Sequence, residues 1–318
     1  MAQDEFAIIQ QYFQGIGPVS DLTRLGIGDD AAVVDLPHGM QQVVCMDTLI
    51  SGVHFPFDTA PGDVAAKALA VNLSDIAAMA ATPCWFLLSL SIPDFNADWL
   101  QRFADGLRQV AEHHGVQLIG GDTCRGELSV TIQVAGQVPT GRYVSRAGAS
   151  AGDLVLVSGQ LGLAGLGLAH LQGHLELPQA LLSRCLQALN RPQARLDLVN
   201  FLRDYASAAI DISDGLQGDL GHILKASGCG ARIDQAALPV DPWITQHGLY
   251  RYALSAGDDY QICCTLPDHH RAEVENWNRR YPERQFSIIG ELVDTGFLLQ
   301  AGDAWIDLDN QGGFRHFD

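Results

Sequence analysis

The sequence predicts an α/β protein, in the broad sense that includes α+β folds, made of two domains. The chain has 318 residues, of which 47% are hydrophobic and 18% charged, which is typical of a folded protein with a full-sized core. Segments with strand and helix patterns alternate along it. A stretch rich in glycine, serine and arginine lies near residues 139–152. Because single cores stop growing at roughly 250–300 residues, we place a domain boundary there and predict domains 1–140 and 150–318.

Proline, glycine and hydrophobic periodicity assign the elements of the first half. Pro61 and Pro83 bracket a segment rich in alanine and leucine, which predicts a helix over 61–81. Residues 128–138 alternate as a strand does. The other expected elements are an amphipathic opening at 6–13, a glycine turn and strand within 25–34, strands at 42–47, 86–92 and 116–119, and a helix at 98–114.

The second half restarts with a strand at 154–157 and a glycine-punctuated turn into a helix at 163–171. The glycine run Gly159, Gly162, Gly165 and Gly167 does not match G-x-G-x-x-G. It favours either a phosphate at a helix N-terminus or close helix packing, and the sequence leaves both open. The remaining expected elements are helices at 179–188, 193–205, from 214 onward and at 268–280, and strands at 208–212, 230–234, 259–266, 286–293 and 297–300.

Composition excludes several partner classes. Asp and Glu number 37 against 19 Lys and Arg, a net charge of -18, so we expect neither nucleic acid nor an anionic membrane as partner. The longest apolar stretch, 76–93, is interrupted by Thr82-Pro83 and by serines, which argues against a membrane span. Seven cysteines without C-x-x-C spacing and an acidic N-terminus without signal-peptide features predict a cytoplasmic protein with reduced thiols.

Aspartates stand where carboxylates are costly. Asp47 ends an apolar strand, Asp122 follows another, Asp211 lies within a third, and Asp75 lies in an apolar helix. A buried, unpaired carboxylate is strongly destabilising, and these segments hold few cations. Divalent metal resolves the conflict, and oxygen ligands favour magnesium or calcium over zinc. Taken alone, Asp29, Asp214 and Asp259 are equally consistent with helix caps or turns.

A polyphosphate is the ligand that best explains several metals in an acidic protein, since ATP would be repelled without bridging cations. The chain has neither a Walker lysine motif nor protein-kinase signatures. Arg142 and Arg146 are candidate phosphate-binding residues, with a solvated surface role as the alternative. His54, just beyond Asp47, is a candidate site residue, although loop histidines often have no special role.

Several longer motifs resemble the thiamine-monophosphate kinase family. The similarity spans nearly the whole chain. The helix motif at 70–79 and the Asp-x-Ser-Asp-Gly-Leu motif at 211–216 are long enough to be specific. The matching segments, in family order and spacing, are Gly26-Ile27-Gly28-Asp29-Asp30-Ala31, Asp47-Thr48-Leu49, Ala70 to Met79 (AVNLSDIAAM), Ile119-Gly120-Gly121-Asp122-Thr123 and Ile210-Asp211-Ile212-Ser213-Asp214-Gly215-Leu216.

The resemblance implies the fold of aminoimidazole ribonucleotide synthetase and selenophosphate synthetase, with an N-terminal α/β domain that dimerises, a C-terminal α/β domain, and ATP between them. It implies ATP-dependent phosphorylation of thiamine monophosphate to thiamine diphosphate, assisted by several Mg²⁺ ions. The implied metal ligands are Asp30, Asp47, Asp75, Asp122, Asp211 and Asp214. Implied ATP contacts are Gly121, Asp122, Arg146 and Ser213, and implied substrate contacts are His54, Asp258 and Phe314. A cationic thiazolium needs an aromatic surface, which Phe314 or Trp305 could supply, with core packing or an ordinary surface position as the alternative for both. The residues expected to carry catalysis are Asp75, Asp122, Arg146 and Asp211.

Two positions depart from the family pattern. Cys45-Met46 stands where Ser-Thr is common, which removes side-chain hydroxyl contacts to metal but keeps the backbone carbonyls. Asp258 stands where the family commonly has Glu, so the side chain expected to contact substrate is one methylene shorter. The acceptor, a phosphate group with a second pKa near 6, is mostly ionised at neutral pH and needs no general base.

Three other functions share part of this pattern. Selenophosphate synthetase resembles a chain with a reactive Cys followed by Lys in a glycine-rich N-terminal segment, whereas the first cysteine here is Cys45. A two-metal phosphohydrolase usually adds histidines, which these motifs do not contain. A non-catalytic Mg-ATP binding protein would use the same aspartates, so the residues alone leave it open.

Overall fold

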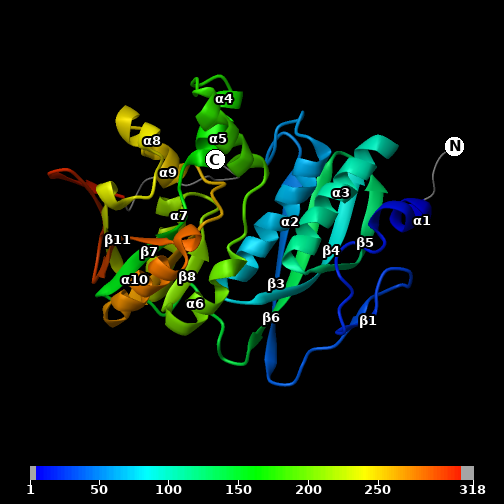
Figure 1. Ribbon diagram of the computed structural model, residues 1–318, viewed down its shortest axis with the longest axis horizontal. Coiled ribbons are helices and arrows are strands. Elements are labelled where there is room, and N and C mark those ends of the chain that lie inside the picture. Colours follow the sequence, from blue (N-terminus) through cyan, green and yellow to red (C-terminus); the bar gives the residue numbers. More distant parts are fainter. Residues whose placement is uncertain (1–4, 309–318) are drawn as a thin grey trace. The chain divides into compact units, whose positions relative to one another are not determined.

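The computed structural model describes residues 5–308 (Figure 1). The chain forms two compact units, one made of Met1–Ile76 and Ala81–Arg142, the other of Ala77–Ala80 and Tyr143–Asp318. Each unit combines a β-sheet with helices, which confirms the predicted fold class. None of the helices within 5–308 is long and apolar enough to cross a membrane.

The first unit is built on a four-stranded sheet of order β3-β6-β4-β5. Its strands are β3 (Met40–Ile50), β6 (Ser129–Pro139), β4 (Thr82–Ile92) and β5 (Gln117–Arg125). Neighbours are antiparallel except β4 and β5, which are parallel and joined by helix α3 (Ala97–His114), because parallel strands need a crossover connection. Helix α2 (Pro61–Ala78) lies beside α3 over the sheet (Figure 1).

Alternation along the strands decides which face is buried. In β3, Leu49 is buried, whereas Val44 and Met46 are exposed. Helix α3 is well terminated: the Asn96 side chain accepts a hydrogen bond from Trp99 N–H, and Gly115 ends the helix at a φ of 67°. The smaller elements are α1 (Glu5–Ile8), a short π-helix (Ile9–Phe13), β1 (Thr23–Leu25) and β2 (Val33–Val34).

The second unit holds a seven-stranded sheet of order β13-β12-β9-β11-β7-β10-β8, antiparallel except between β9 and β12. The strands are β7 (Asp153–Ser158), β8 (Ala208–Asp211), β9 (Gly230–Asp234), β10 (Ile262–Pro267), β11 (Phe286–Val293), β12 (Phe297–Ala301) and β13 (Ala304–Asp307). The helices are α4 (Leu163–Leu171), α5 (Gln179–Asn190), α6 (Val199–Tyr205), α7 (Leu216–Ser227), α8 (Pro242–His247), α9 (Arg251–Ser255) and α10 (Arg271–Arg280).

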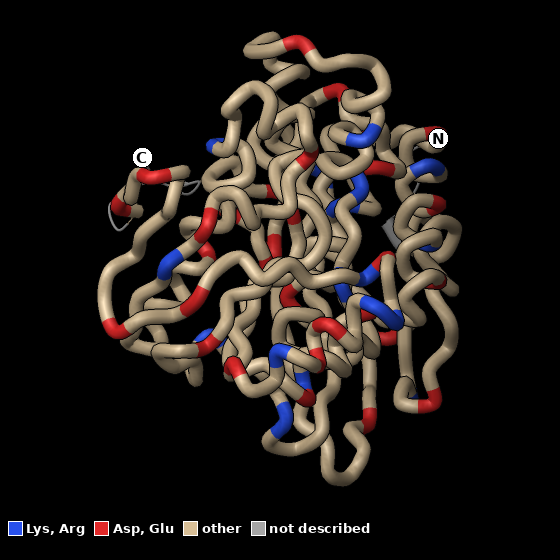
Figure 2. The backbone as a smooth tube through the Cα atoms, turned by 60° about the vertical axis from the view of Figure 1, so that its left-hand side comes forward, with Lys and Arg blue, Asp and Glu red and all other residues tan. Residues whose placement is uncertain are grey.

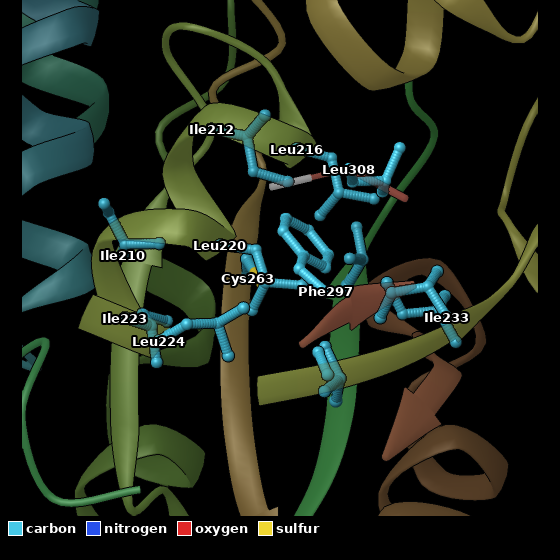
Figure 3. Close-up of a cluster of buried hydrophobic side chains, with 14 of the residues drawn as sticks. Ile210, Ile212, Leu216, Leu220, Ile223, Leu224, Ile233, Cys263, Phe297 and Leu308 are labelled. Carbon is cyan, nitrogen blue, oxygen red and sulfur yellow. The ribbon is translucent and has the colours of Figure 1, made fainter. Parts of the chain in front are cut away.

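Apolar side chains point to both faces of the central strands, because successive residues of a strand alternate between the two faces. Val155 and Val157 of β7 join the cluster formed with α7, where Ile210 and Leu220 converge with Phe297 (Figure 3). The side chains between them, at positions 154 and 156, join the cluster on the other face with α6 and α10. The central strands are therefore buried on both faces.

Some predicted boundaries were wrong. The strand expected at 259–266 begins only at Ile262, because the backbone before it takes left-handed conformations. The helix expected over 193–205 is a 3-10 turn at 196–198 followed by α6, and α7 starts at Leu216 rather than at 214. Elements α8, α9 and β13 were not predicted, because they are short and carry little periodic pattern.

Candidate functional site

A pocket of about 1000 Å³ lies in the first unit and gathers three of the predicted site residues, Asp30, Gly121 and Asp122. Its walls come from the N-terminal segment, the glycine-rich turn between β1 and β2, and strands β4 and β5. Asp30 and Asp122 are exposed, and the Asp29 carboxylate accepts a hydrogen bond from Asp30 N–H at 2.8 Å. The pocket thus exposes carboxylates to solvent beside the exposed backbone of Gly121.

Gly121 is required by the sheet itself. Its φ is +150°, and a Cβ at this position would overlap the carbonyl oxygen of Leu88 on the neighbouring strand. The register pairs Leu88 with Gly121 and Ser89 with Asp122. Glycine therefore allows β4 and β5 to pair closely at the point where Asp122 lines the pocket.

Asp47 and Asp75 form a second carboxylate pair in the first unit. Asp47 lies on β3 and Asp75 on α2, and both are half-buried, whereas the sequence suggested that Asp75 is buried. Burial raises the pKa of Asp47, while the nearby His54 and a hydrogen bond with Asp75 lower it. The Asn72 side chain accepts a hydrogen bond from Asp47 N–H at 3.0 Å, so α2 fixes the backbone at this carboxylate.

His54 lies in the turn that follows β3. Its Nδ1 accepts a hydrogen bond from Ile50 N–H at 3.0 Å, and its carbonyl accepts one from Lys67 Nζ at 3.2 Å. Lys67, on α2, is 2% exposed. Sequence reasoning did not assign Lys67 a role, although one lysine in an apolar helix was a signal that something holds it there. The histidine ring is held by the turn and the loop is tied to α2.

The predicted residues of the second unit lie where β8 leads into α7. Asp211 is buried at the end of β8, and Ser213 and Asp214 are half-buried in the following loop. Asp219, which the sequence analysis missed, accepts a hydrogen bond from Asp214 N–H at 3.0 Å. Burial, followed by the Asp211 charge, raises the pKa of Asp219 to about 8. Its apolar helical setting was the same signal that singled out Asp75.

The residues at 257–260 lie just before β10. Asp258 is half-buried with a φ of 61°, and Asp259 is buried. Both Asp259 carboxylate oxygens accept from Gly162 N–H, at 2.8 and 3.0 Å, at the N-terminus of α4. The protein's own carboxylate therefore occupies this helix terminus. Gly165 and Gly167 allow close approach to Ala256 and Cys185, so the packing interpretation of the glycine run is confirmed.

The remaining predicted residues are not gathered into these clusters. Arg142 and Arg146 are exposed, and the Arg146 carbonyl accepts a hydrogen bond from Ser227 Oγ at 3.2 Å. Trp305, on β13, is 52% exposed. Phe314 lies outside the described residues.

The carboxylate clusters fit magnesium in their chemistry. Within residues 5–308, no three His, Cys, Asp or Glu side chains are placed to hold one ion together. Magnesium, however, is usually held by one or two carboxylates and completes its octahedron with waters and phosphate oxygens. Burial raises the pKa of Asp47 and of Asp219, and the Asp211 charge adds to the rise at Asp219, so these carboxylates are donors that a divalent cation would stabilise.

Two domain families match this chain, one in each half. The N-terminal domain model of AIR synthase related proteins matches residues 28–138, and the C-terminal domain model matches residues 150–298. The chain is thus an AIR synthase related protein in both of its halves.

Individual relatives define the family. The thiamine-monophosphate kinase of Escherichia coli (strain K12) is 45% identical over 284 residues, covering 86% of both chains. The crystal structure of thiamine-monophosphate kinase from Stenotrophomonas maltophilia K279a is 39% identical, with a TM-score of 0.83 over 89% of this chain and 93% of that one. The structure of AaThiL complexed with AMPPCP and TMP is 32% identical, with a TM-score of 0.77 over 94% and 93%. This chain belongs to the thiamine-monophosphate kinase family, as its motifs predicted.

Proposed function

We propose that this protein transfers the γ-phosphoryl group of ATP directly to thiamine monophosphate, forming thiamine diphosphate, with several Mg²⁺ ions assisting an in-line displacement. The observation that carries the proposal is the 45% identity to a thiamine-monophosphate kinase over 86% of both chains. The relative complexed with AMPPCP and TMP supports an adenine nucleotide and thiamine monophosphate as the two ligands.

The chain's own residues would act mainly by positioning and by arranging charge. The acceptor phosphate is itself the nucleophile and is already ionised, so no side chain needs to remove a proton. When bound, magnesium would neutralise the phosphate oxygens and the charge that develops on them. Asp30, Asp47, Asp75, Asp122, Asp211 and Asp214 are the proposed ligands. Gly121, Asp122, Arg146 and Ser213 are the proposed ATP contacts.

The acceptor side is assigned to His54, Asp258 and Phe314. The Nδ1 of His54 accepts a hydrogen bond from Ile50 N–H, which fixes the ring near Asp47. Asp258, half-buried in a left-handed conformation, is held by a hydrogen bond from its N–H to Ser213 O at 2.8 Å. Asp75, Asp122, Arg146 and Asp211 are the residues proposed to be indispensable for transfer.

We also propose that residues 1–140 form a domain through which the protein forms a homodimer, and that residues 150–318 form a second domain. The dimer proposal is supported by the outward face of β3, where Val44 is 52% and Met46 63% exposed. Sedimentation of the protein and of Met46→Lys tests it. A monomeric wild-type protein at micromolar concentration would contradict the dimer. The seven free cysteines support a reducing compartment such as the cytoplasm.

Phosphorus NMR tests the reaction directly. The protein is incubated with Mg-ATP and thiamine monophosphate, beside samples that lack one substrate. We expect thiamine diphosphate to appear in step with ADP. Orthophosphate in the ATP-only sample would instead indicate a phosphohydrolase. ATP binding without any product would favour a non-catalytic nucleotide-binding protein.

A further inference from the structure

The segment Gly257 to Tyr260 has an unusual backbone. Gly257, Asp258 and Tyr260 have φ values of 73°, 61° and 48°. Glycine adopts such angles freely and aspartate tolerates them, whereas the bulky side chain of Tyr260 disfavours them. A strained conformation persists only where its surroundings hold it firmly. The segment connects α9 to β10 and contains Asp258, the proposed substrate contact.

One side of the segment is held by its backbone. Asp258 N–H donates to Ser213 O and Tyr260 N–H donates to Ile212 O, each at 2.8 Å. Gly257 lies so close to Ser213 that a Cβ would overlap the Ser213 carbonyl oxygen. The segment is therefore tied to the loop that follows β8.

On its other side, the segment from Gly257 to Tyr260 is held by the Asp259 side chain. Asp259 is 7% exposed, and both of its oxygens accept from Gly162 N–H at 2.8 and 3.0 Å. Gly162 precedes the first turn of α4, where N–H groups lack partners within the helix and are met by side-chain acceptors. Gly162 is itself fixed, because a Cβ there would crowd Ala253 N. Asp259 thus joins α4 to the residue that follows Asp258.

We propose that Asp259 is a positioning residue for the acceptor substrate. By holding the strained segment between α4 and the loop after β8, it fixes Asp258 where that side chain meets thiamine monophosphate, without touching substrate itself. The inference rests on the proposed function, in which Asp258 contacts thiamine monophosphate.

Steady-state kinetics of Asp259→Ala and Asp259→Asn test this role. Asp259→Ala removes the carboxylate that accepts the hydrogen bond from Gly162 N–H, and we expect it to raise the KM for thiamine monophosphate about tenfold. Displacing a positioned group by about 1 Å can reduce the efficiency of an enzyme by up to about a hundredfold. The kcat should fall less, since a displaced binding group weakens ground-state and transition-state binding alike. Asp259→Asn keeps an oxygen for Gly162 N–H, and we expect its KM to stay within about twofold of wild type.

Asp241 offers a matched control in the same unit. It is 8% exposed and caps α8, accepting from Trp243 N–H at 2.9 Å, and it also pairs with Arg184 at 2.6 Å. Asp241→Ala should lower the Tm while leaving the KM for thiamine monophosphate unchanged. If both alanine variants raise this KM equally, Asp259 has only a structural role and the proposal fails.

A double-mutant cycle tests whether Asp259 acts through Asp258. Residues that act through one another give non-additive effects. Once Asp258→Ala has raised the KM, adding Asp259→Ala should raise it by less than about twofold more. Fully multiplicative effects would overturn the proposal.

Hydrogen exchange supplies a readout that needs no turnover. Asp259→Ser, whose side chain is too short to reach Gly162, is the variant to use if Asp259→Ala does not fold. In this variant the amides of Asp258 and Tyr260 should exchange at least about tenfold faster than in wild type, because opening of the segment exposes them. Unchanged exchange would overturn the proposal. A wild-type protein that does not phosphorylate thiamine monophosphate would refute the proposed function, while the exchange result would still decide whether Asp259 holds the segment.

Discussion

At the scale of single residues, the arrangement around Asp47 and Asp75 places two carboxylates in contact. Burial raises the pKa of Asp47, although His54 and the hydrogen bond with Asp75 oppose that rise. Burial of a charged carboxylate is destabilising in the free protein, and a bound divalent cation would offset that cost. These aspartates should therefore matter more to activity than to stability.

Asp75→Asn is the sharpest test of that expectation. The amide keeps the shape of the side chain but removes the charge, so we expect phosphoryl transfer to fall below about 1% of wild type, a loss typical of a group that stabilises the transition state. The Tm should be unchanged or slightly higher. Asp63→Asn is the matched control, since Asp63 is also half-buried on α2, and it should keep activity within about twofold. An active Asp75→Asn variant would remove Asp75 from the mechanism.

Asp259 predicts a pH dependence of stability. Burial, and then the neighbouring charges of Asp258 and Asp219, raise its pKa well above 3.8, although the hydrogen bond from Gly162 opposes the rise. A raised folded-state pKa gives stability that is complete below the unfolded pKa and is lost as the pH rises toward the folded one. From pH 4 upward, wild type should therefore lose unfolding free energy relative to Asp259→Asn, by at most about 1.4 kcal/mol per pH unit. Unfolding free energies are measured by urea denaturation of both proteins from pH 4 to 8, and a difference between them that does not change with pH would contradict this prediction.

At the scale of elements, β10 is buried on both faces, and its two cysteines point to different clusters. Burial raises the pKa of Cys264 to about 12, and it raises the pKa of Cys185 on α5 to about 11. Because the thiolate is the reactive form, both should resist alkylation in the native protein, whereas the exposed Cys124 on β5 should react first. Mass spectrometry of iodoacetamide-treated protein, with a urea-unfolded control, measures this. Early labelling of Cys264 would show that β10 opens.

Periodic elements were the ones that sequence could predict. The bounds of α4, β9 and β11 agree with the predicted ranges, because glycines and apolar runs mark their ends clearly. The segment before β10 could not be predicted, since its left-handed angles are imposed by hydrogen bonds to residues 212 and 213, far away in sequence. Short elements such as α8 depend on tertiary packing in the same way.

The site was predictable in its residue types and less so in its partners. Aspartates at strand ends were visible because carboxylates are unexpected there. The pairing of Asp47 with Asp75 depends on how separate segments meet, whereas that of Asp214 with Asp219 is a local contact at the start of α7 that no motif marked. Lys67 and Asn72, which fix the backbone beside two site residues, had no motif of their own.

At the scale of the whole molecule, the net charge of -18 dominates the electrostatics. Acidic segments outnumber basic ones along the backbone (Figure 2). Divalent cations that bind the native carboxylates should raise stability by mass action. We expect 5 mM MgCl₂ to raise the Tm by roughly 1–2 °C, the size of shift that about 1 kcal/mol gives in a chain of 318 residues. NaCl at equal ionic strength should do less, and equal shifts would show that screening alone is responsible.

The boundary between the two units falls within helix α2, which limits where the chain can be cut or recombined. The helix spans Pro61–Ala78, yet Ala77–Ala80 belongs to the second unit, where the Ala80 carbonyl accepts a hydrogen bond from Arg203 at 2.7 Å. The chain consequently passes between units after residues 76, 80 and 142. A chimera joined at residue 142 would therefore exchange the second unit without the four residues that complete its core. Recombination between relatives should succeed more often when residues 77–80 come from the parent that supplies the C-terminal half.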